Sequence, residues 1–358
     1  MKSANKIPLW TILLPVMAWI VFIIVHYVHS VALIPVSAIF LIAAVLSAVH
    51  HAETIAHAVG EPFGTLVLAL AVTMIEVSLI VSLMFAGGKD TSVLARDTVF
   101  AAVMIILNGM IGLSILTGGI RFKQQNFIQQ GINAALITLV TISVLTLILP
   151  NFTVSVPGPF YNKQQLIFAA IVTLILYGTF VLVQNVRHRD HFQSSAEDPE
   201  EVSEHPSSRT AWISGFLLIL CLGAVVALAE SLAPGLEAWI KSIGAPVSLV
   251  GVIIAVVVLL PEGLSAYNAA RKNQLQKSLN LSLGSALASI GLTIPTVSFV
   301  SLITGLPLSL GISAGSSVLF LLSLFVIILS LSTGKTTILP GVVLLLIFAI
   351  YIFSIIFP

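Results

Sequence analysis

Residues 66–85 read LVLALAVTMIEVSLIVSLMF, twenty positions with a single charged side chain, that of Glu76. An apolar helix of about 20 residues is long enough to cross the hydrocarbon core of a bilayer. Residues 249–266 form a second stretch of this kind, which also holds one carboxylate, Glu262. Both stretches predict membrane-spanning helices with an acidic group past the middle of the span.

The composition of the whole chain is that of a membrane protein. Its 358 residues are 58% hydrophobic and 8% charged, whereas soluble domains carry roughly 25% charged residues. Lys and Arg number 15 and Asp and Glu number 14, so there is no basic surplus for binding nucleic acid. One cysteine, Cys221, excludes a disulfide scaffold. Soluble enzymes and nucleic-acid-binding proteins are excluded, and the lipid bilayer is the expected surrounding.

Hydrophobic stretches of suitable length predict eleven transmembrane helices. They are expected at about residues 8–28, 32–54, 62–86, 95–117, 130–149, 164–186, 211–232, 245–269, 278–303, 313–331 and 337–357. With this count, eleven Lys and Arg residues fall on one side of the membrane and four on the other. Because basic loops stay in the cytoplasm, we expect a multi-pass protein of the cell (inner) membrane, with its N-terminus cytoplasmic and its C-terminus periplasmic.

A hydrophilic segment, residues 187–210, divides the predicted helices and is expected to be an acidic cytoplasmic linker, with a cation-sensing segment as the alternative. Residues 1–30 then form an extra helix, residues 31–186 a first group of five helices, and residues 211–358 a second group. Because five is odd, two homologous groups would have opposite orientations, as in many transporters. The expected fold class is all-α integral membrane, one extra helix plus two inverted five-helix repeats.

Glu76 and Glu262 lie in the second helix of each group, so they occupy equivalent positions in the two repeats. Burying a carboxylate near the bilayer centre costs about 3 kcal/mol on insertion scales. One such residue could be a protonated packing group. Two at matching positions favour a functional site near the midplane.

Side chains with oxygen atoms accompany both carboxylates. The candidate supporting ligands are Thr73, Ser78, Asn108, Ser265, Ser285 and Ser289. In the ninth span, hydroxyl residues recur every three or four positions and predict one continuous stripe, which also suits helix packing: Ser278, Ser282, Ser285, Ser289, Thr293 and Thr296. Carboxylates and neutral oxygens suit hard cations, and desolvated carboxyls take up protons near neutral pH. Glu76 and Glu262 are therefore the predicted metal and proton ligands, and we expect no cofactor besides the transported Ca²⁺ (or Na⁺/K⁺) and H⁺.

The sequence resembles the cation/Ca²⁺ exchanger superfamily, and within it the bacterial ChaA-type antiporters. The resemblance lies in residues 51–53, 60–64, 75–80, 261–264 and 280–295. It implies that Glu76 and Glu262 bind Ca²⁺ and H⁺ in turn. Where many exchangers have Asn three residues before each Glu, this chain has Thr73 and Leu259, and ChaA-like members are associated with Na⁺ and K⁺ as well.

A second polar cluster is predicted at the cytoplasmic end of the second span, at His51, Glu53, His57 and Glu61. On a continuing helix the last three would share one face. The alternatives are a solvated helix end, a cytoplasmic entry vestibule or pH sensor, and a zinc site.

These features predict a secondary active antiporter that exports Ca²⁺, and also Na⁺ or K⁺, in exchange for H⁺ by alternating access. The alternatives are a Na⁺(K⁺)/H⁺ antiporter with little Ca²⁺ transport, and a cation channel. An enzyme is not expected, because the string at residues 311–315 that imitates a nucleophile elbow follows no strand.

Overall fold

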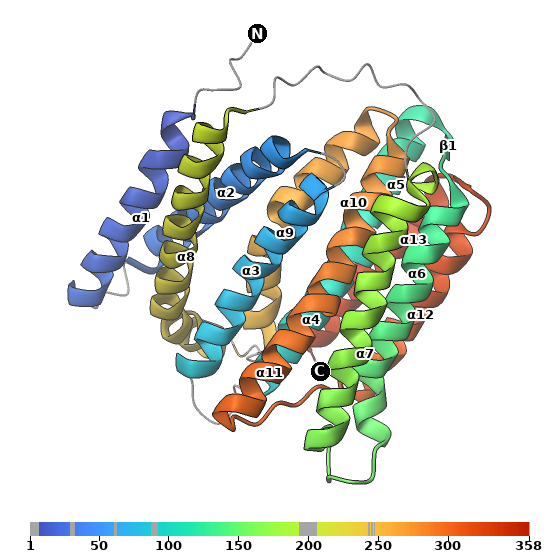
Figure 1. The fold of residues 1–358 in the computed structure, drawn as a ribbon. Helices are drawn as coiled ribbons and strands as arrows, with labels where there is room; N and C mark the ends of the chain where they lie inside the picture. The colour runs from blue at the N-terminus through green and yellow to red at the C-terminus, as the bar shows by residue number, and fades with distance from the viewer. Residues whose placement is uncertain are drawn as a thin grey trace. The chain divides into compact units, whose positions relative to one another are not determined.

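The computed structural model describes residues 7–357, apart from 29–32, 61–62, 87–91, 193–205, 243, 245 and 247. Nearly all of this part of the chain is helical (Figure 1). The first helices are α1 (Leu9–Val28), α2 (Ile34–Val59), α3 (Phe63–Ala86), α4 (Leu94–Met104), η3 (Ile105–Met110), α5 (Ile111–Phe122), α6 (Gln129–Ser143), η4 (Val144–Ile148), η5 (Leu149–Phe152), α7 (Lys163–Leu182), η6 (Val183–Arg187) and η7 (Arg189–His191). The later helices are α8 (Ser208–Ser242), α9 (Ser248–Arg271), α10 (Leu275–Ala288), η8 (Ser289–Thr293), α11 (Ile294–Thr304), α12 (Ala314–Leu331) and α13 (Ile338–Ile356).

The predicted spans are confirmed. Within the described residues, ten helices are long and apolar enough to cross a membrane, and α3 contributes the shorter apolar stretch Val67–Ser82. The end predicted for the seventh span, residue 232, is wrong. Helix α8 continues to Ser242 with Pro234 inside it, because an interior proline can bend a helix without ending it.

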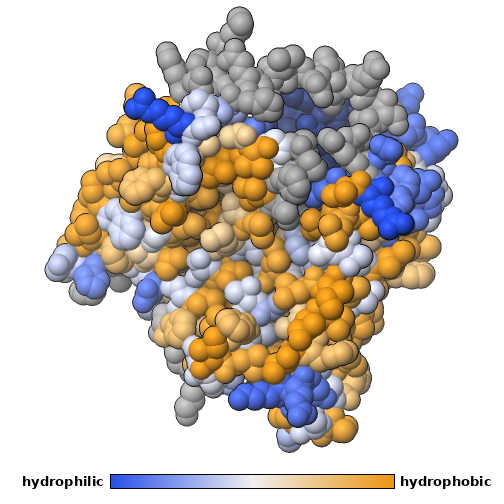
Figure 2. All heavy atoms as spheres, in the orientation of Figure 1, coloured by the Kyte–Doolittle hydropathy of each residue, from blue (hydrophilic) through white to orange (hydrophobic). Residues whose placement is uncertain are grey.

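Large apolar side chains cover much of the surface. Among the exposed ones are Trp212, Ile219, Ile137 and Phe325. On the face shown in Figure 2, hydrophobic residues spread over the middle of the view and strongly hydrophilic ones gather toward its upper and lower parts. Such a surface suits a lipid environment, because lipid tails are as apolar as these side chains.

The chain forms two compact units. Unit 1 comprises Met1–Gly88 and Ala196–Val250, and unit 2 comprises Lys89–Ser195 and Gly251–Pro358. Unit 1 therefore holds α1, α2, α3 and α8, and unit 2 holds the other helices, with α9 from Gly251 onward. Each unit draws helices from both predicted sequence halves, so the compact units are not the sequence repeats.

The helix packing within unit 2 follows the inverted repeat. The third helices of the two halves, α4–η3–α5 and α10–η8–α11, are antiparallel neighbours, because α4 contacts α11 and η8 whereas α5 contacts α10. Further contacts occur in matching pairs. Helix α7 packs on η8 and α11 as α13 packs on η3 and α5. Two repeats of opposite orientation require such pairing.

Short strands join two loops of unit 2. β1 (Gln125–Asn126) pairs antiparallel with β2 (Lys335–Thr336), with Gln125 opposite Thr336. The pairing ties the α5–α6 loop to the α12–α13 loop.

Helices α5 and α13 approach each other closely at Gly341. A Cβ atom at this position would lie 2.5 Å from the Leu116 nitrogen and 2.9 Å from the Gly112 carbonyl oxygen. Both atoms belong to a helix backbone, so they have little freedom to move aside. Only glycine fits this crossing without a shift of one helix.

We expect Gly341→Ala to lower the free energy of unfolding by about 1–3 kcal/mol, as overpacking of a tight contact does. Thermal unfolding in detergent micelles would measure the change. Gly178→Ala in α7 is the control, because a Cβ there meets no described atom within 4 Å. Equal melting temperatures for the two variants would contradict the packing argument.

Candidate cation-binding site

Glu76 lies in the second half of α3, thirteen positions after Phe63, and is 4% exposed. Leu79 and Ile80 beside it are buried as well. Thr73 lies one turn earlier, and its hydroxyl donates to the Ala69 carbonyl at 2.9 Å. That bond uses the hydroxyl proton, so the oxygen keeps its lone pairs as an acceptor on the Glu76 face of the helix.

Glu262 takes the corresponding position in α9, fourteen positions after Ser248, and is half-buried. Both α3 and α9 have 24 residues. Pro261 precedes Glu262 inside the helix and has no N–H to donate to Val257 four residues back. The Val257 carbonyl therefore lacks its usual helical donor one turn from the carboxyl group.

Helix α9 runs parallel to α4–η3, and the two make contacts at equal intervals along their length. A Cβ on Gly251 would lie 3.1 Å from the Thr98 nitrogen, and one on Gly263 would lie 3.7 Å from the Met110 Cγ atom. The second contact follows the first by twelve residues on both helices. Glu262, next to Gly263, is therefore level with the part of η3 that contains Asn108.

Asn108 is fully buried in η3, and its amide has a defined orientation. Its Nδ2 donates to the Ser323 Oγ atom at 3.0 Å and to the Met104 carbonyl at 3.3 Å. Its Oδ1 has no hydrogen-bond partner among the described residues. Both N–H donors are directed to Ser323 and Met104, so the amide oxygen is available to accept a hydrogen bond or to bind a cation. Amide oxygens are ligands for hard cations.

Ser323 is a residue that sequence reasoning missed. It lies in α12 in the apolar run FLLSLF and is fully buried. Its hydroxyl donates to the Leu319 carbonyl at 2.8 Å and accepts from Asn108. A lone hydroxyl within an apolar span was the available signal, because a buried polar group needs a partner.

The hydroxyl stripe of the ninth span is interrupted. Ser282 is fully buried, Ser285 is half-buried, and Ser289 is 3% exposed at the start of η8. Thr296 is exposed and donates to the Leu292 carbonyl at 2.8 Å. The expected continuous stripe is wrong beyond η8, because a π-helical turn changes the 3.6-residue phase of the positions that follow.

Two further predicted ligands lie at less enclosed positions. Ser78 is half-buried in α3, and Ser265 is exposed in α9 one turn after Glu262. Their role as ligands stays a prediction.

The second predicted cluster, on α2, is described only in part, and its role stays a prediction. His51 is fully buried, with its Nε2 atom 3.2 Å from the Thr11 carbonyl of α1. Glu53 is half-buried and His57 is exposed one turn later. Helix α2 ends at Val59, before Gly60 at φ 76°, and Glu61 lies outside the described residues. No set of three metal-binding side chains occurs in the described part of the chain.

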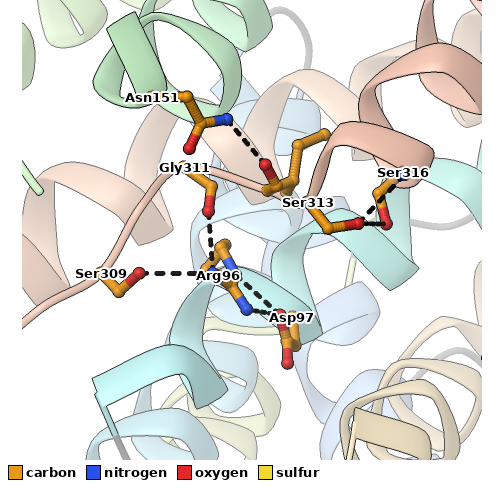
Figure 3. Close-up of polar contacts among 8 residues, drawn as sticks. Arg96, Asp97, Asn151, Ser309, Gly311, Ser313 and Ser316 are labelled. Carbon is orange, nitrogen blue, oxygen red and sulfur yellow. Dashed lines mark hydrogen bonds and ion pairs between the residues drawn. The ribbon is translucent and has the colours of Figure 1, made fainter. Parts of the chain in front are cut away.

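Arg96 at the start of α4 was counted in the sequence only as a loop charge, but it holds a buried segment in place (Figure 3). Its guanidinium contacts the Asp97 carboxylate at 2.7 Å and donates to the Gly311 carbonyl at 2.8 Å and the Ser309 hydroxyl at 3.3 Å. Asn151 donates to the Ile312 carbonyl at 2.6 Å. These bonds satisfy the non-helical backbone of Ser309–Ile312, which a bilayer would otherwise leave without partners.

A cavity of about 300 Å³ lies elsewhere in unit 2, lined by Tyr161, Lys163, Ser301 and Leu306 among others. Burial raises the pKa of Tyr161 to about 12, so the phenol stays protonated and donates to the Leu145 carbonyl at 2.6 Å. The lining contains no acidic side chain. The cavity is therefore separate from the candidate cation site.

Comparisons with known proteins agree with this architecture. The sequence matches the sodium/calcium exchanger protein family over residues 29–186 and 213–357. It is 43% identical to the protein y4hA of Sinorhizobium fredii (strain NBRC 101917 / NGR234), over 98% of this chain and 96% of that protein. It is 35% identical to the sodium-potassium/proton antiporter ChaA of Escherichia coli (strain K12), over 88% and 86%. The solved H⁺/Ca²⁺ exchanger CAX superposes with a TM-score of 0.70 at 16% identity, over 96% and 86%.

The inverted helical repeats, with one intramembrane acidic group in the second helix of each, define a multi-pass membrane transporter. The chain belongs to the sodium/calcium exchanger family. The resemblance found in the sequence is thereby confirmed.

We expect Ser323→Ala to lower the free energy of unfolding by about 1 kcal/mol, the net value of a buried hydrogen bond. The substitution also frees the Asn108 amide to rotate, so cation-dependent exchange should slow. Ser330→Ala is a control in the same helix, where the hydroxyl donates to Val326 four residues back at 2.7 Å. Thermal unfolding and flux assays would compare the two, and an equal response would contradict the role given to Ser323.

Proposed function

We propose that this protein is a secondary active cation/proton antiporter that works by alternating access. Its first candidate cation is Ca²⁺, exported in exchange for H⁺. The observation that carries the proposal is the pair of carboxylates, Glu76 and Glu262, at equivalent positions in the 24-residue helices α3 and α9. A transporter made of inverted repeats binds its substrate near the midplane at the repeat interface. Each repeat then contributes one acidic ligand.

The chemistry of these groups accounts for exchange. A carboxylate held away from water is costly unless it binds a cation or a proton. Two carboxylates are neutralised by one divalent cation or by two protons, so the two loads compete. The neutral ligands proposed beside them are Thr73, Ser78, Asn108, Ser265, Ser285 and Ser289.

Exchange of Na⁺ or K⁺ for H⁺ is the second candidate. It is favoured by the relative named sodium-potassium/proton antiporter, at 35% identity over 88% of this chain. The solved structure of similar fold is named an H⁺/Ca²⁺ exchanger. An amide at position 73 or 259 would add a further oxygen ligand, but this chain has Thr73 and Leu259 there. Fewer oxygen ligands favour a site that is not restricted to Ca²⁺.

The proposed setting is the inner membrane of the cell, with the N-terminus in the cytoplasm and the C-terminus outside. The excess of Lys and Arg in alternate loops supports this orientation. The acidic linker is then cytoplasmic.

We expect Glu76→Gln and Glu262→Gln each to abolish cation-driven proton movement, because an amide of the same shape cannot take up a proton or balance a cation. Proteoliposomes with an internal pH dye and an imposed pH difference would measure it, with Ca²⁺, Na⁺ and K⁺ added separately. Glu230→Gln makes the same chemical change at an exposed site in α8 and should leave exchange intact.

The outcomes separate the alternatives. Cation flux without proton movement in the unmodified protein would indicate a channel or uniporter. Exchange that persists in either of the two glutamine variants would show that the wrong carboxylate had been chosen.

A further inference from the structure

Helix α1 contains a proline, Pro15, in its interior. In an α-helix the carbonyl of residue i accepts from the N–H of residue i+4. The residue four before Pro15 is Thr11, and proline has no N–H to donate. The Thr11 carbonyl is therefore left without its helical donor, on a fully buried residue.

His51 of α2 supplies the missing donor. Its Nε2 atom lies 3.2 Å from the Thr11 carbonyl oxygen, and the histidine is 0% exposed. Because a carbonyl only accepts, the bonded nitrogen must carry the proton. The other ring nitrogen, Nδ1, is buried and has no hydrogen-bond partner among the described residues. This arrangement suits a neutral imidazole protonated on Nε2, since a second ring proton would be buried without an acceptor.

A second polar contact fixes α1 on the other side. Trp19 donates from Nε1 to the Leu220 carbonyl of α8 at 3.1 Å. Its ring fits against Gly223, where an added Cβ would come within 2.9 Å of it. All three helices belong to unit 1, and α2 and α8 also pack on each other. Helix α1 is thus bonded to both members of the α2–α8 pair.

The position of α2 matters for α3, because the end of one helix contacts the start of the other. Gly60 donates to the Ala56 carbonyl at 2.9 Å, and Gly64 donates to the Gly60 carbonyl at 2.7 Å. A Cβ on Gly64 would lie 2.5 Å from the Ala56 oxygen. The end of α2 and the start of α3 are therefore in direct backbone contact, twelve residues before Glu76.

We propose that His51 is a positioning residue that completes the hydrogen bonding of α1 and keeps this extra helix docked on α2 during exchange. It acts through the Thr11 carbonyl that Pro15 leaves free, and not as a vestibule ligand. Docked in this way, α1 holds α2 and α8 together and so maintains the position of α3 and Glu76. The effect on exchange rests on the function proposed above, whereas the hydrogen bond does not.

A double-mutant cycle between Pro15 and His51 tests this inference. His51→Leu should lower the melting temperature by about 2–4 °C and slow exchange several-fold, because it leaves the Thr11 carbonyl without a donor. Pro15→Ala restores an N–H to that carbonyl, which has room for two donors. In the Pro15→Ala background, His51→Leu should therefore have little effect on either quantity.

Two controls make the cycle specific. His51→Gln places an amide N–H near the position of Nε2 and should restore both stability and exchange. His50→Leu removes the neighbouring imidazole, whose ring lies 5.5 Å from that of Trp10, and its effect should be the same with and without the Pro15→Ala substitution. Melting temperatures are measured in detergent and exchange rates in proteoliposomes.

The inference is overturned if His51→Leu is equally harmful with and without Pro15→Ala, or if His51→Gln fails to restore exchange while restoring stability. The latter result would indicate an ion-binding or proton-binding role for the imidazole. A different result would contradict the proposed transport function alone. In that result the melting temperatures follow the expected cycle, but the unmodified protein shows no exchange.

Discussion

Inside a bilayer no water is available, so every polar group must find its partner within the protein. The described structure obeys this constraint at several irregular places. The carbonyl freed by Pro15 meets His51, and the amide of Asn108 meets Ser323. The non-helical carbonyls of Gly311 and Ile312 accept from Arg96 and Asn151. Each of these bonds joins residues far apart in sequence, so the constraint on polar groups also determines which helices pack together.

The same constraint explains why the two intramembrane carboxylates, Glu76 and Glu262, are important. Hydrogen bonds inside the protein can satisfy a neutral donor such as the Asn108 amide nitrogen, but a carboxylate also carries a charge that hydrogen bonds do not remove. No Lys or Arg occurs near Glu76 or Glu262 along α3 or α9. A mobile cation or proton is the partner that the proposed function assigns to each carboxylate. In the proposed function, cation and proton compete for these two carboxylates, and this competition drives the exchange.

The sequence predicted the features that depend on local composition. Apolar length identified the spans, and the odd number of helices in each half indicated the inverted repeat that unit 2 displays. The sequence did not predict Ser323 or the partners of His51 and Arg96, because those contacts join residues 215, 40 and up to 215 positions apart. The stripe in the ninth span failed for another reason. A single π-helical segment, η8, changes the direction in which the following side chains point. The pattern of side chains from Ser289 to Thr296 does not indicate such a segment.

The charge balance of the site also bears on which cation it carries. One Ca²⁺ neutralises two carboxylates, whereas one Na⁺ or K⁺ neutralises them only when one carboxyl keeps its proton. Both loads exchange against protons without net charge in the site, so two acidic groups alone do not separate the ions. Selection must then come from the number of neutral oxygens that replace the hydration shell, since Ca²⁺ takes six to eight. In this chain Thr73 and Leu259 stand where amide ligands would add to that number, whereas Asn108 of η3 has an amide oxygen without a hydrogen-bond partner among the described residues. In the proposed site, the choice between divalent and monovalent cations therefore depends on neutral ligands such as Asn108, whose amide is oriented by its bond to Ser323.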